Sequence, residues 1–274
     1  MFAGNVARVD HPAPHLPPSG PARFNVQGVG ISALSLDQAR DLVLAARGQR
    51  RLGYICVCTT HSIGEARRDP ALRGIFHRSN LNTPDGMPLV WLGRAAGHRA
   101  ITRVYGPDLM LAVCDAGRAI GLKHYFFGGL PGVAEKLRMS LTARFPGLQV
   151  VGTHTPPFRE LTPGEFARLQ AEIVEKKPDI VWVGLSTPKQ ERFMAGAWER
   201  LDAGLLIGVG AAFDFHSGRI AQAPRWMQRS GLEWFFRLCA EPRRLWKRYF
   251  INNPLFVLRA FAQWTGLRRY PLDR

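Results

Sequence analysis

Short apolar runs alternate with amphipathic stretches along most of the chain from residue 24 onward. The apolar runs show little polar alternation, which is the pattern of strands that are buried on both faces. Helical periodicity between them indicates crossover helices. We therefore expect an α/β fold, with a Rossmann-like, mostly parallel sheet flanked by helices and with ligands at the carboxyl ends of the strands. Strands are predicted at residues 24–30, 54–59, 124–128, 148–151, 180–185 and 205–209.

Capping residues mark where several of the helices begin. Ser35 precedes a helical pattern over residues 36–46, and its hydroxyl is suited to cap that helix. Thr162 opens a capping box with proline in the first turn, which predicts a helix over residues 165–176. Thr187 stands in the same arrangement, so we expect it to cap the next helix, over residues 191–201.

The pattern changes after residue 223, where basic and aromatic residues share helical segments. Between residues 243 and 250, arginine and lysine interleave with Leu245, Trp246, Tyr249 and Phe250, which predicts a helix with one basic and one apolar face. We expect a flexible leader at residues 1–22, an α/β core at 23–222 and a basic amphipathic helical tail at 223–274.

Charge and composition narrow the possible partners. The net charge is +16, and residues 219–274 hold twelve Lys and Arg against three acids, so +9 lies in that segment. Such a segment favours a polyanion such as nucleic acid, an anionic lipid surface or a diphosphate. No apolar run reaches about 18 residues, so no membrane-spanning helix is expected. The four cysteines are sparse, which is typical of a reducing cytoplasm, and Cys56 and Cys58 fit one buried face of a strand.

Two charged residues at predicted strand ends have a chemical and a plain interpretation. Asp85 lies in the sequence TPDG, which is strong turn chemistry but also leaves a carboxylate free to act as a general base. Arg103 precedes a predicted helix, where it is either solvated or placed to clamp a diphosphate. His61 and His216 have no metal-ligand spacing, and no Asp-x-Asp motif occurs, so no metal and no cofactor are expected.

Two glycine-rich loops follow predicted strands. Residues 128–132 (GGLPG) suit either a tight turn or backbone N–H groups that cradle a phosphate at a helix N-terminus. Residues 208–214 (GVGAAFD) suit either close packing or the approach of a ligand, with Asp214 positioned to hold a ribose or sugar hydroxyl. Gln190 is explained by helix capping alone.

The order and number of these motifs resemble the WecG/TagA/CpsF glycosyltransferases (glycosyltransferase family 26) over residues 24–249. The resemblance implies an inverting, metal-independent transfer from a UDP-sugar to a sugar on undecaprenyl diphosphate, at the inner face of the plasma membrane, in bacterial exopolysaccharide or cell-surface glycan synthesis. The matching stretches read PDG, RVYGPD, FGGLPG, VGLSTPKQE, GVGAAFD, APRW and LEWFFRLCAEPRRLWKRY.

The resemblance also implies roles for individual residues. Asp85 matches the general base, and Thr59, Arg103 and Gln190 match active-site positions. In the tail, Arg237 and Arg244 match arginines that reach over the nucleotide diphosphate, and the third such position holds Lys247. Together with the glycine loops, the predicted donor-binding residues are Gly129, Gly132, Gly208, Gly210, Asp214, Arg237, Arg244 and Lys247.

Departures from the family pattern leave the donor and acceptor sugars open. His61 stands where the family commonly has asparagine, and residues 155–158 replace a frequent Gly-Tyr-Phe. UDP-glucose, UDP-N-acetylmannosamine and an acidic sugar all remain possible donors, and self-association through the tail's apolar face remains open. The alternative is a nucleotide-binding or basic membrane- or nucleic-acid-binding protein without transferase activity, although nucleic acid is not an expected partner of the transferase.

Overall fold

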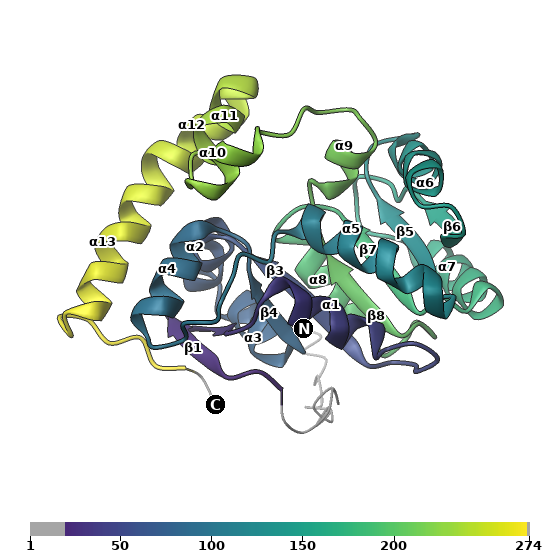
Figure 1. The fold of residues 1–274 in the computed structure, drawn as a ribbon. Coiled ribbons are helices and arrows are strands. Elements are labelled where there is room, and N and C mark those ends of the chain that lie inside the picture. The colour runs from purple at the N-terminus through teal and green to yellow at the C-terminus, as the bar shows by residue number, and fades with distance from the viewer. Residues whose placement is uncertain (1–19, 273–274) are drawn as a thin grey trace, which may run out of the picture.

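A parallel six-stranded sheet forms the centre of the molecule, in the order β4-β3-β8-β7-β5-β6 (Figure 1). The computed structural model describes residues 20–272, without the side chains of residues 244, 247, 248 and 251. Because all six strands are parallel, their carboxyl ends meet at one edge. The α/β prediction is confirmed. The strands are β3 (Gly53–Cys58), β4 (Leu81–Pro84), β5 (Lys123–Gly128), β6 (Gln149–His154), β7 (Ile180–Gly184) and β8 (Leu205–Gly208).

Helices cover both faces of this sheet (Figure 1). One apolar cluster joins the sheet to α1 (Leu36–Leu44), α5 (Gly106–Gly117), α6 (Val133–Arg144) and α9 (Ala212–His216). The other joins it to helices on the opposite face, namely α2 (Thr60–Arg68), α3 (Pro70–Arg78), α4 (Met87–Ala95), α7 (Pro163–Lys176) and α8 (Lys189–Ala197). A single 3₁₀ turn, η1 (Arg118–Ile120), follows α5.

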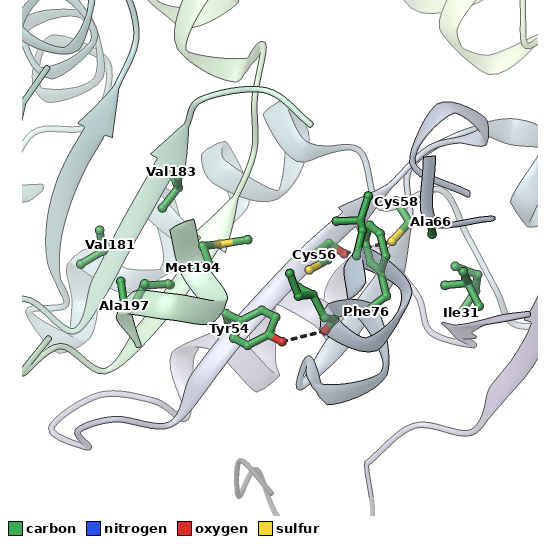
Figure 2. Close-up of a cluster of buried hydrophobic side chains, with 14 of the residues drawn as sticks. Ile31, Tyr54, Cys56, Cys58, Ala66, Phe76, Val181, Val183, Met194 and Ala197 are labelled. Atoms are coloured by element: carbon green, nitrogen blue, oxygen red, sulfur yellow. Dashed lines mark hydrogen bonds between the residues drawn. The ribbon is translucent and has the colours of Figure 1, made fainter. Parts of the chain in front are cut away.

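Strand β3 shows how alternate side chains enter the two clusters. Tyr54, Cys56 and Cys58 pack on one face, and Ile55 and Val57 pack on the other. Figure 2 shows the cluster that contains Tyr54, Cys56 and Cys58, in which the Tyr54 hydroxyl donates to the Ile75 carbonyl at 2.7 Å. The predicted burial of both strand faces, and of both cysteines, is confirmed.

The structure corrects one predicted strand and gives the bounds of another. Residues 24–30 are not one strand but part of a hairpin of β1 (Arg23–Val26) and β2 (Val29–Ser32), which pair antiparallel outside the main sheet. The chain reverses at Gln27 and Gly28, which both have positive φ as a two-residue hairpin turn requires. The strand-like region before Asp85 is β4, and the sequence pattern does not define its bounds because it is short and buries the polar Asn82, whose amide donates to two backbone carbonyls.

Two of the three predicted caps are present. Ser35 and Thr162 both form capping boxes at the starts of α1 and α7. The prediction for Thr187 is wrong, because α8 begins at Lys189 with no side-chain cap and ends at Ala197. The Thr187 hydroxyl instead donates to the Glu191 carboxylate at 2.9 Å, since that carboxylate is fully buried and needs a donor.

The C-terminal helices form an arm that passes beside α2 and α4 and returns to β1 (Figure 1). Their bounds are α10 (Arg225–Arg229), α11 (Glu233–Ala240), α12 (Pro242–Lys247), the π-helical turn η2 (Arg248–Asn252) and α13 (Asn253–Trp264).

The far end of this arm is attached to the core. Phe256 is buried in the core, and its carbonyl accepts from the Gln27 amide at 3.0 Å. The Tyr270 carbonyl accepts from the Asn25 amide at 2.6 Å. Of the predicted leader at residues 1–22, residues 1–19 lie outside the described residues. Within residues 20–272, no helix has the length and apolar character that crossing a bilayer requires.

Candidate active site

Asp85 lies where β4 ends, and its side chain is 13% exposed. Its backbone N–H donates to the Cys58 carbonyl at 2.9 Å, which fixes the loop against β3. Burial raises the pKa of the Asp85 carboxyl to about 6, with the charge of Glu233 adding to the rise and Arg103 opposing it. A carboxylate with this pKa is ionised at neutral pH and basic enough to accept a proton, which suits a general base. The TPDG segment is therefore a turn, and its Asp85 also has the raised pKa that suits a general base.

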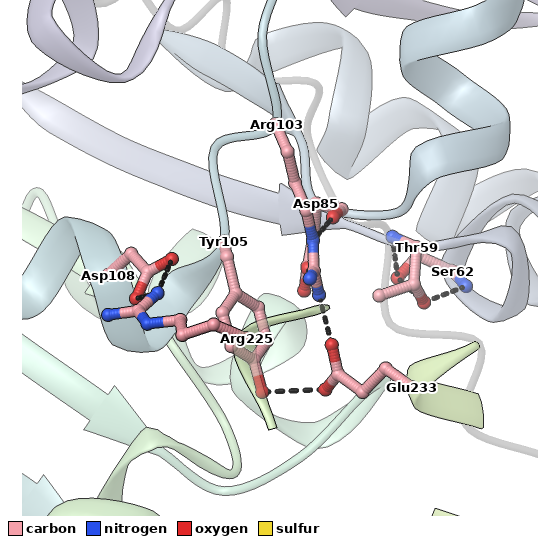
Figure 3. A network of polar contacts seen from close by, with 8 residues as sticks. All are labelled: Thr59, Ser62, Asp85, Arg103, Tyr105, Asp108, Arg225 and Glu233. Atoms are coloured by element: carbon pink, nitrogen blue, oxygen red, sulfur yellow. Dashed lines mark hydrogen bonds and ion pairs between the residues drawn. The ribbon is translucent and has the colours of Figure 1, made fainter. Parts of the chain in front are cut away.

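The Arg103 guanidinium lies between two carboxylates rather than in solvent (Figure 3). Its Nε donates to the Asp85 carbonyl at 2.5 Å, and its Nη2 lies 3.3 Å from Asp85 Oδ1. The same Nη2 donates to Glu233 Oε2 at 2.6 Å. The guanidinium also stacks over the Tyr105 ring, 3.9 Å from its centroid. Of the two interpretations of Arg103, the solvated one is wrong.

Glu233 brings the C-terminal arm into this cluster. Its Oε1 accepts from the Tyr105 hydroxyl at 2.7 Å, and its side chain is only 11% exposed (Figure 3). Arg237 follows one turn later on α11, lies 5.7 Å from the Phe215 ring and lowers the pKa of Asp85 through its charge. The site is therefore built from both the sheet and the arm.

Sequence reasoning missed Glu233 and Tyr105 as site residues. The available signal for Glu233 was its position: it is an acid in a basic segment, four residues before Arg237 and so on the same helix face. Tyr105 lies inside the RVYGPD motif. A second ion pair also joins the arm to the core, because Arg225 of α10 donates to both oxygens of Asp108 at 2.9 and 3.0 Å.

Thr59 occupies the end of β3, next to β4. Its hydroxyl accepts from the Ser62 backbone N–H at 3.3 Å and forms the capping box of α2 (Figure 3). His61 follows in the first turn of α2, with its Nδ1 3.8 Å from the Glu65 carboxylate. The structure thus places Thr59 one strand away from Asp85, at the N-terminus of a helix.

Gln190 lies at the same carboxyl edge of the sheet, in the first turn of α8. It is buried and does not cap α8, so that interpretation is wrong. Its Nε2 donates to Glu191 Oε1 at 3.1 Å, whereas its own Oε1 has no hydrogen-bond partner among the described residues. Gly208 at the end of β8 makes room for it, because a Cβ there would lie 3.1 Å from the Gln190 amide. Burial raises the pKa of Glu191.

The GGLPG loop opens onto a cavity of about 340 Å³ at the start of α6. Gly129 and Gly132 both have positive φ, and Gly132 is the residue before the first turn of the helix. Lys136 and Arg219 give the cavity two cations, and Arg219 also pairs with Asp214 at 2.9 Å. The arrangement fits an anion at a helix N-terminus. The cavity is lined by Leu130, Pro131, Gly132, Val133, Lys136, Ser217, Gly218 and Arg219.

The sheet order sets the distance between these features. Strand β4, which carries Asp85, is four positions from β5, which carries the GGLPG loop. At about 4.8 Å per strand this is roughly 19 Å along the edge, with Thr59 and Gln190 between.

Arg244 and Lys247 belong to α12, and their side chains lie outside the described residues. In the described part of the chain, no group of three or more His, Cys, Asp or Glu side chains is placed to hold a metal ion.

Comparison with known proteins places this arrangement in a family. The model of the glycosyl transferase WecG/TagA/CpsF family matches residues 24–270, which include the whole sheet, the Asp85 cluster and most of the arm. The chain belongs to this family. Among curated proteins, the N-acetylglucosaminyldiphosphoundecaprenol N-acetyl-beta-D-mannosaminyltransferase of Bacillus subtilis (strain 168) is 28% identical to it over 186 residues, 67% of this chain and 69% of that protein.

Proposed function

We propose that this WecG/TagA/CpsF-family glycosyltransferase moves a sugar from a UDP-sugar to a sugar carried on undecaprenyl diphosphate, with inversion and without a metal. The observation that carries the proposal is Asp85, a buried carboxylate with a raised pKa at the carboxyl edge of the sheet. Family membership and the Bacillus subtilis relative, whose name specifies a diphosphoundecaprenol-linked sugar, support the reaction class and the kind of acceptor.

The reaction follows from what Asp85 can do. Its carboxylate takes the proton of the acceptor hydroxyl while that oxygen forms a bond to the anomeric carbon of the donor sugar. The bond from the anomeric carbon to the diphosphate oxygen breaks, and UDP leaves with the electron pair from the opposite face. The anomeric configuration therefore inverts. Arg103 holds Asp85 by its main chain and by its carboxylate, so the base is fixed before the acceptor arrives.

Without a metal, the negative charge that develops on the leaving diphosphate must be stabilised by cationic side chains of the protein. Arg237 already lies close enough for its charge to influence Asp85, and Arg244 and Lys247 follow on α12. One well-placed donor at such a developing charge is worth about 2.7–4 kcal/mol in comparable sites. The unpartnered Gln190 Oε1 is suited to accept from a hydroxyl of a bound sugar. The GGLPG loop, beside a cavity lined by Lys136 and Arg219, is the proposed position for the remainder of the donor.

The surface of the arm supports a position at the inner face of the plasma membrane. On α13, Val257, Leu258, Phe261 and Trp264 are each more than half exposed, whereas Phe256 faces the core. This apolar face is accompanied by exposed arginines at 268 and 269. Each basic residue near an anionic leaflet contributes about 1 kcal/mol of binding. A lipid-linked acceptor would then be presented to Asp85 without leaving the bilayer.

Membrane binding can be tested separately from catalysis. We expect Phe261→Ser with Trp264→Ser to weaken co-sedimentation with vesicles containing anionic lipid. Met139→Ser, which removes an equally exposed apolar side chain from α6, is the control and should bind as wild type does. Equal binding by all three proteins would contradict a membrane role for α13.

The function itself is tested by a donor panel. Purified full-length protein is incubated with UDP-sugars and short-chain polyprenyl-diphosphate sugars in EDTA, and UDP release, product mass and anomeric configuration are measured. Transfer should survive EDTA, invert the configuration and be lost in Asp85→Asn. Asp115→Asn, which removes an exposed carboxylate on α5, should remain active. Retention of configuration, a metal requirement or an active Asp85→Asn variant would refute the proposal.

A further inference from the structure

A single guanidinium serves two carboxylates that come from distant parts of the chain. Arg103 contacts Asp85 through Nε and Nη2, and the same Nη2 contacts Glu233, 130 residues away in sequence. Glu233 is an acid in a segment that is otherwise strongly basic. An acid at this position does not help the segment to bind lipid or diphosphate. We therefore explain it by its contacts with Arg103 and Tyr105.

We propose that Glu233 is a positioning residue, whose carboxylate docks α11 onto Arg103 and Tyr105 and so makes the arm one wall of the active site. This inference rests on the proposed function, because it takes Asp85 as the base. Glu233 acts through Arg103 and through the placement of Arg237, and it takes no part in the chemical step.

The geometry fixes the register of α11 at one point. Both Glu233 oxygens are engaged, Oε2 by Arg103 and Oε1 by the Tyr105 hydroxyl. The two donors are themselves held together, since the guanidinium stacks on the Tyr105 ring at 3.9 Å. Undocking of α11 breaks both of these contacts at once, so the ionised Glu233 carboxylate favours the docked position.

The docked register also sets where Arg237 lies. One helical turn separates it from Glu233, so the two side chains share the face that meets the core. Arg237 reaches the Phe215 ring of α9, and the Tyr105 ring lies 6.4 Å from the same ring. Anchoring Glu233 therefore fixes the position of the Arg237 cation in the wall that the arm contributes to the site.

A second interpretation treats the Glu233 carboxylate as a placeholder for a phosphate that displaces it from Arg103. The contacts favour positioning, because Arg103 also holds Asp85, and a diphosphate bound there would lie against the carboxylate of the base. The two interpretations give opposite results when Glu233 is neutralised. Positioning predicts a loss of turnover, and a placeholder predicts a gain in activity.

The pH profile provides a readout that a purely structural role would not change. The charged and titratable groups that act on Asp85 are Arg103, Glu233 and Arg237, and Cys58 on β3 lies close enough to respond to its charge. Removing the negative charge of Glu233 lowers the pKa of Asp85, as does any gain in solvent access when α11 lifts; these two effects outweigh the smaller, opposite effect of moving the Arg237 charge away. The acid limb of kcat/KM, expected near pH 6 in the wild type, should therefore move to lower pH.

The experiment compares Glu233→Gln with Arg225→Gln in the full-length protein. Arg225→Gln also removes one charge from the contact between arm and core, but it touches Asp108 and not Arg103. Glu233→Gln should lower kcat by about 100-fold, the loss expected from a displacement of about 1 Å in the site, and shift the acid limb. Hydrogen–deuterium exchange of α11 should become faster while the core peptides keep wild-type protection. Arg225→Gln should change each of these less.

Three results would overturn the proposal. These are wild-type kcat with wild-type α11 exchange in Glu233→Gln, higher activity in that variant, or a loss of kcat with an unmoved acid limb and unmoved exchange. If the wild type itself transfers no sugar, the proposed function fails, but faster α11 exchange in Glu233→Gln still tests the docking contact on its own. Tyr105→Phe, which removes one of the two donors to Glu233, should fall between the wild type and Glu233→Gln in α11 exchange.

Discussion

Replacing Asp85 with asparagine is expected to make the protein more stable while it abolishes transfer. The carboxyl has a pKa of about 6 in the folded protein, against 3.8 for an ordinary aspartate. Below pH 3.8 both folded and unfolded chains hold the proton. Between 3.8 and 6 the folded chain holds more protons than the unfolded chain, so the free energy of unfolding falls as the pH rises. Above pH 6 both chains have released the proton, and the free energy of unfolding has fallen by the full amount that the two pKa values set.

The size of this loss follows from the two pKa values. A difference from 3.8 to about 6, at about 1.4 kcal/mol per pH unit, corresponds to ~3 kcal/mol. Asp85→Asn should recover most of this at pH 7.5, because asparagine is neutral and its Oδ1 can still accept from Arg103. For a domain of this size the gain corresponds to a rise in Tm of roughly 6–12 °C. At pH 4 the gain should fall below about 1 kcal/mol.

The assay is thermal and urea unfolding of both proteins at pH 7.5 and pH 4. Asp214→Asn is the control, since it loses a partly exposed ion pair with Arg219 and should change stability by no more than about 1 kcal/mol. If Asp85→Asn melts below the wild type at pH 7.5, the carboxylate stabilises the fold as an ordinary ion-pair partner. The account of Asp85 as a base held at an energetic cost would then be wrong.

Three further outcomes are expected. In the wild type, kcat/KM should fall about tenfold per pH unit below about pH 6 as Asp85 is protonated, and a flat profile to pH 5 would contradict this. Tyr54→Phe should lower the free energy of unfolding in urea by about 1–1.5 kcal/mol, because the buried Ile75 carbonyl loses its donor. Gly128→Ala should cost at least about 2 kcal/mol, since its Cβ would lie 2.6 Å from a backbone oxygen, whereas Gly147→Ala, with positive φ but open space, should cost less.

The sequence predicts the sheet well because burial leaves a direct trace in the pattern. Strands such as β3, β7 and β8 are buried on both faces, and their runs are almost wholly apolar. Caps such as Ser35 and Thr162 are equally local, since each depends on residues three positions apart. The bounds of strand β4 could not be predicted in this way, because its buried Asn82 is satisfied by carbonyls from other elements.

The site was only partly predictable for the same physical reason. Asp85 and Arg103 stand at loop positions that the strand pattern marks, whereas Glu233 acquires its role only when α11 folds against them. Thr187 illustrates the converse, because its local surroundings predict a cap, but a buried carboxylate one turn later takes its hydroxyl. Contacts of this kind depend on the tertiary structure and leave no local signal.

The arm is attached to the core at both of its ends, and this decides how it can open. Its near end is held by Glu233 and Arg225, and its far end by Phe256 and by hydrogen bonds from Asn25 and Gln27. If the near end lets go, the far end keeps α10 and α11 close to their docking surface, at an effective concentration that for short tethers is in the millimolar range. Reclosure is then an intramolecular event, independent of protein concentration. The far contacts would therefore shorten the path that α10 and α11 travel in reclosing.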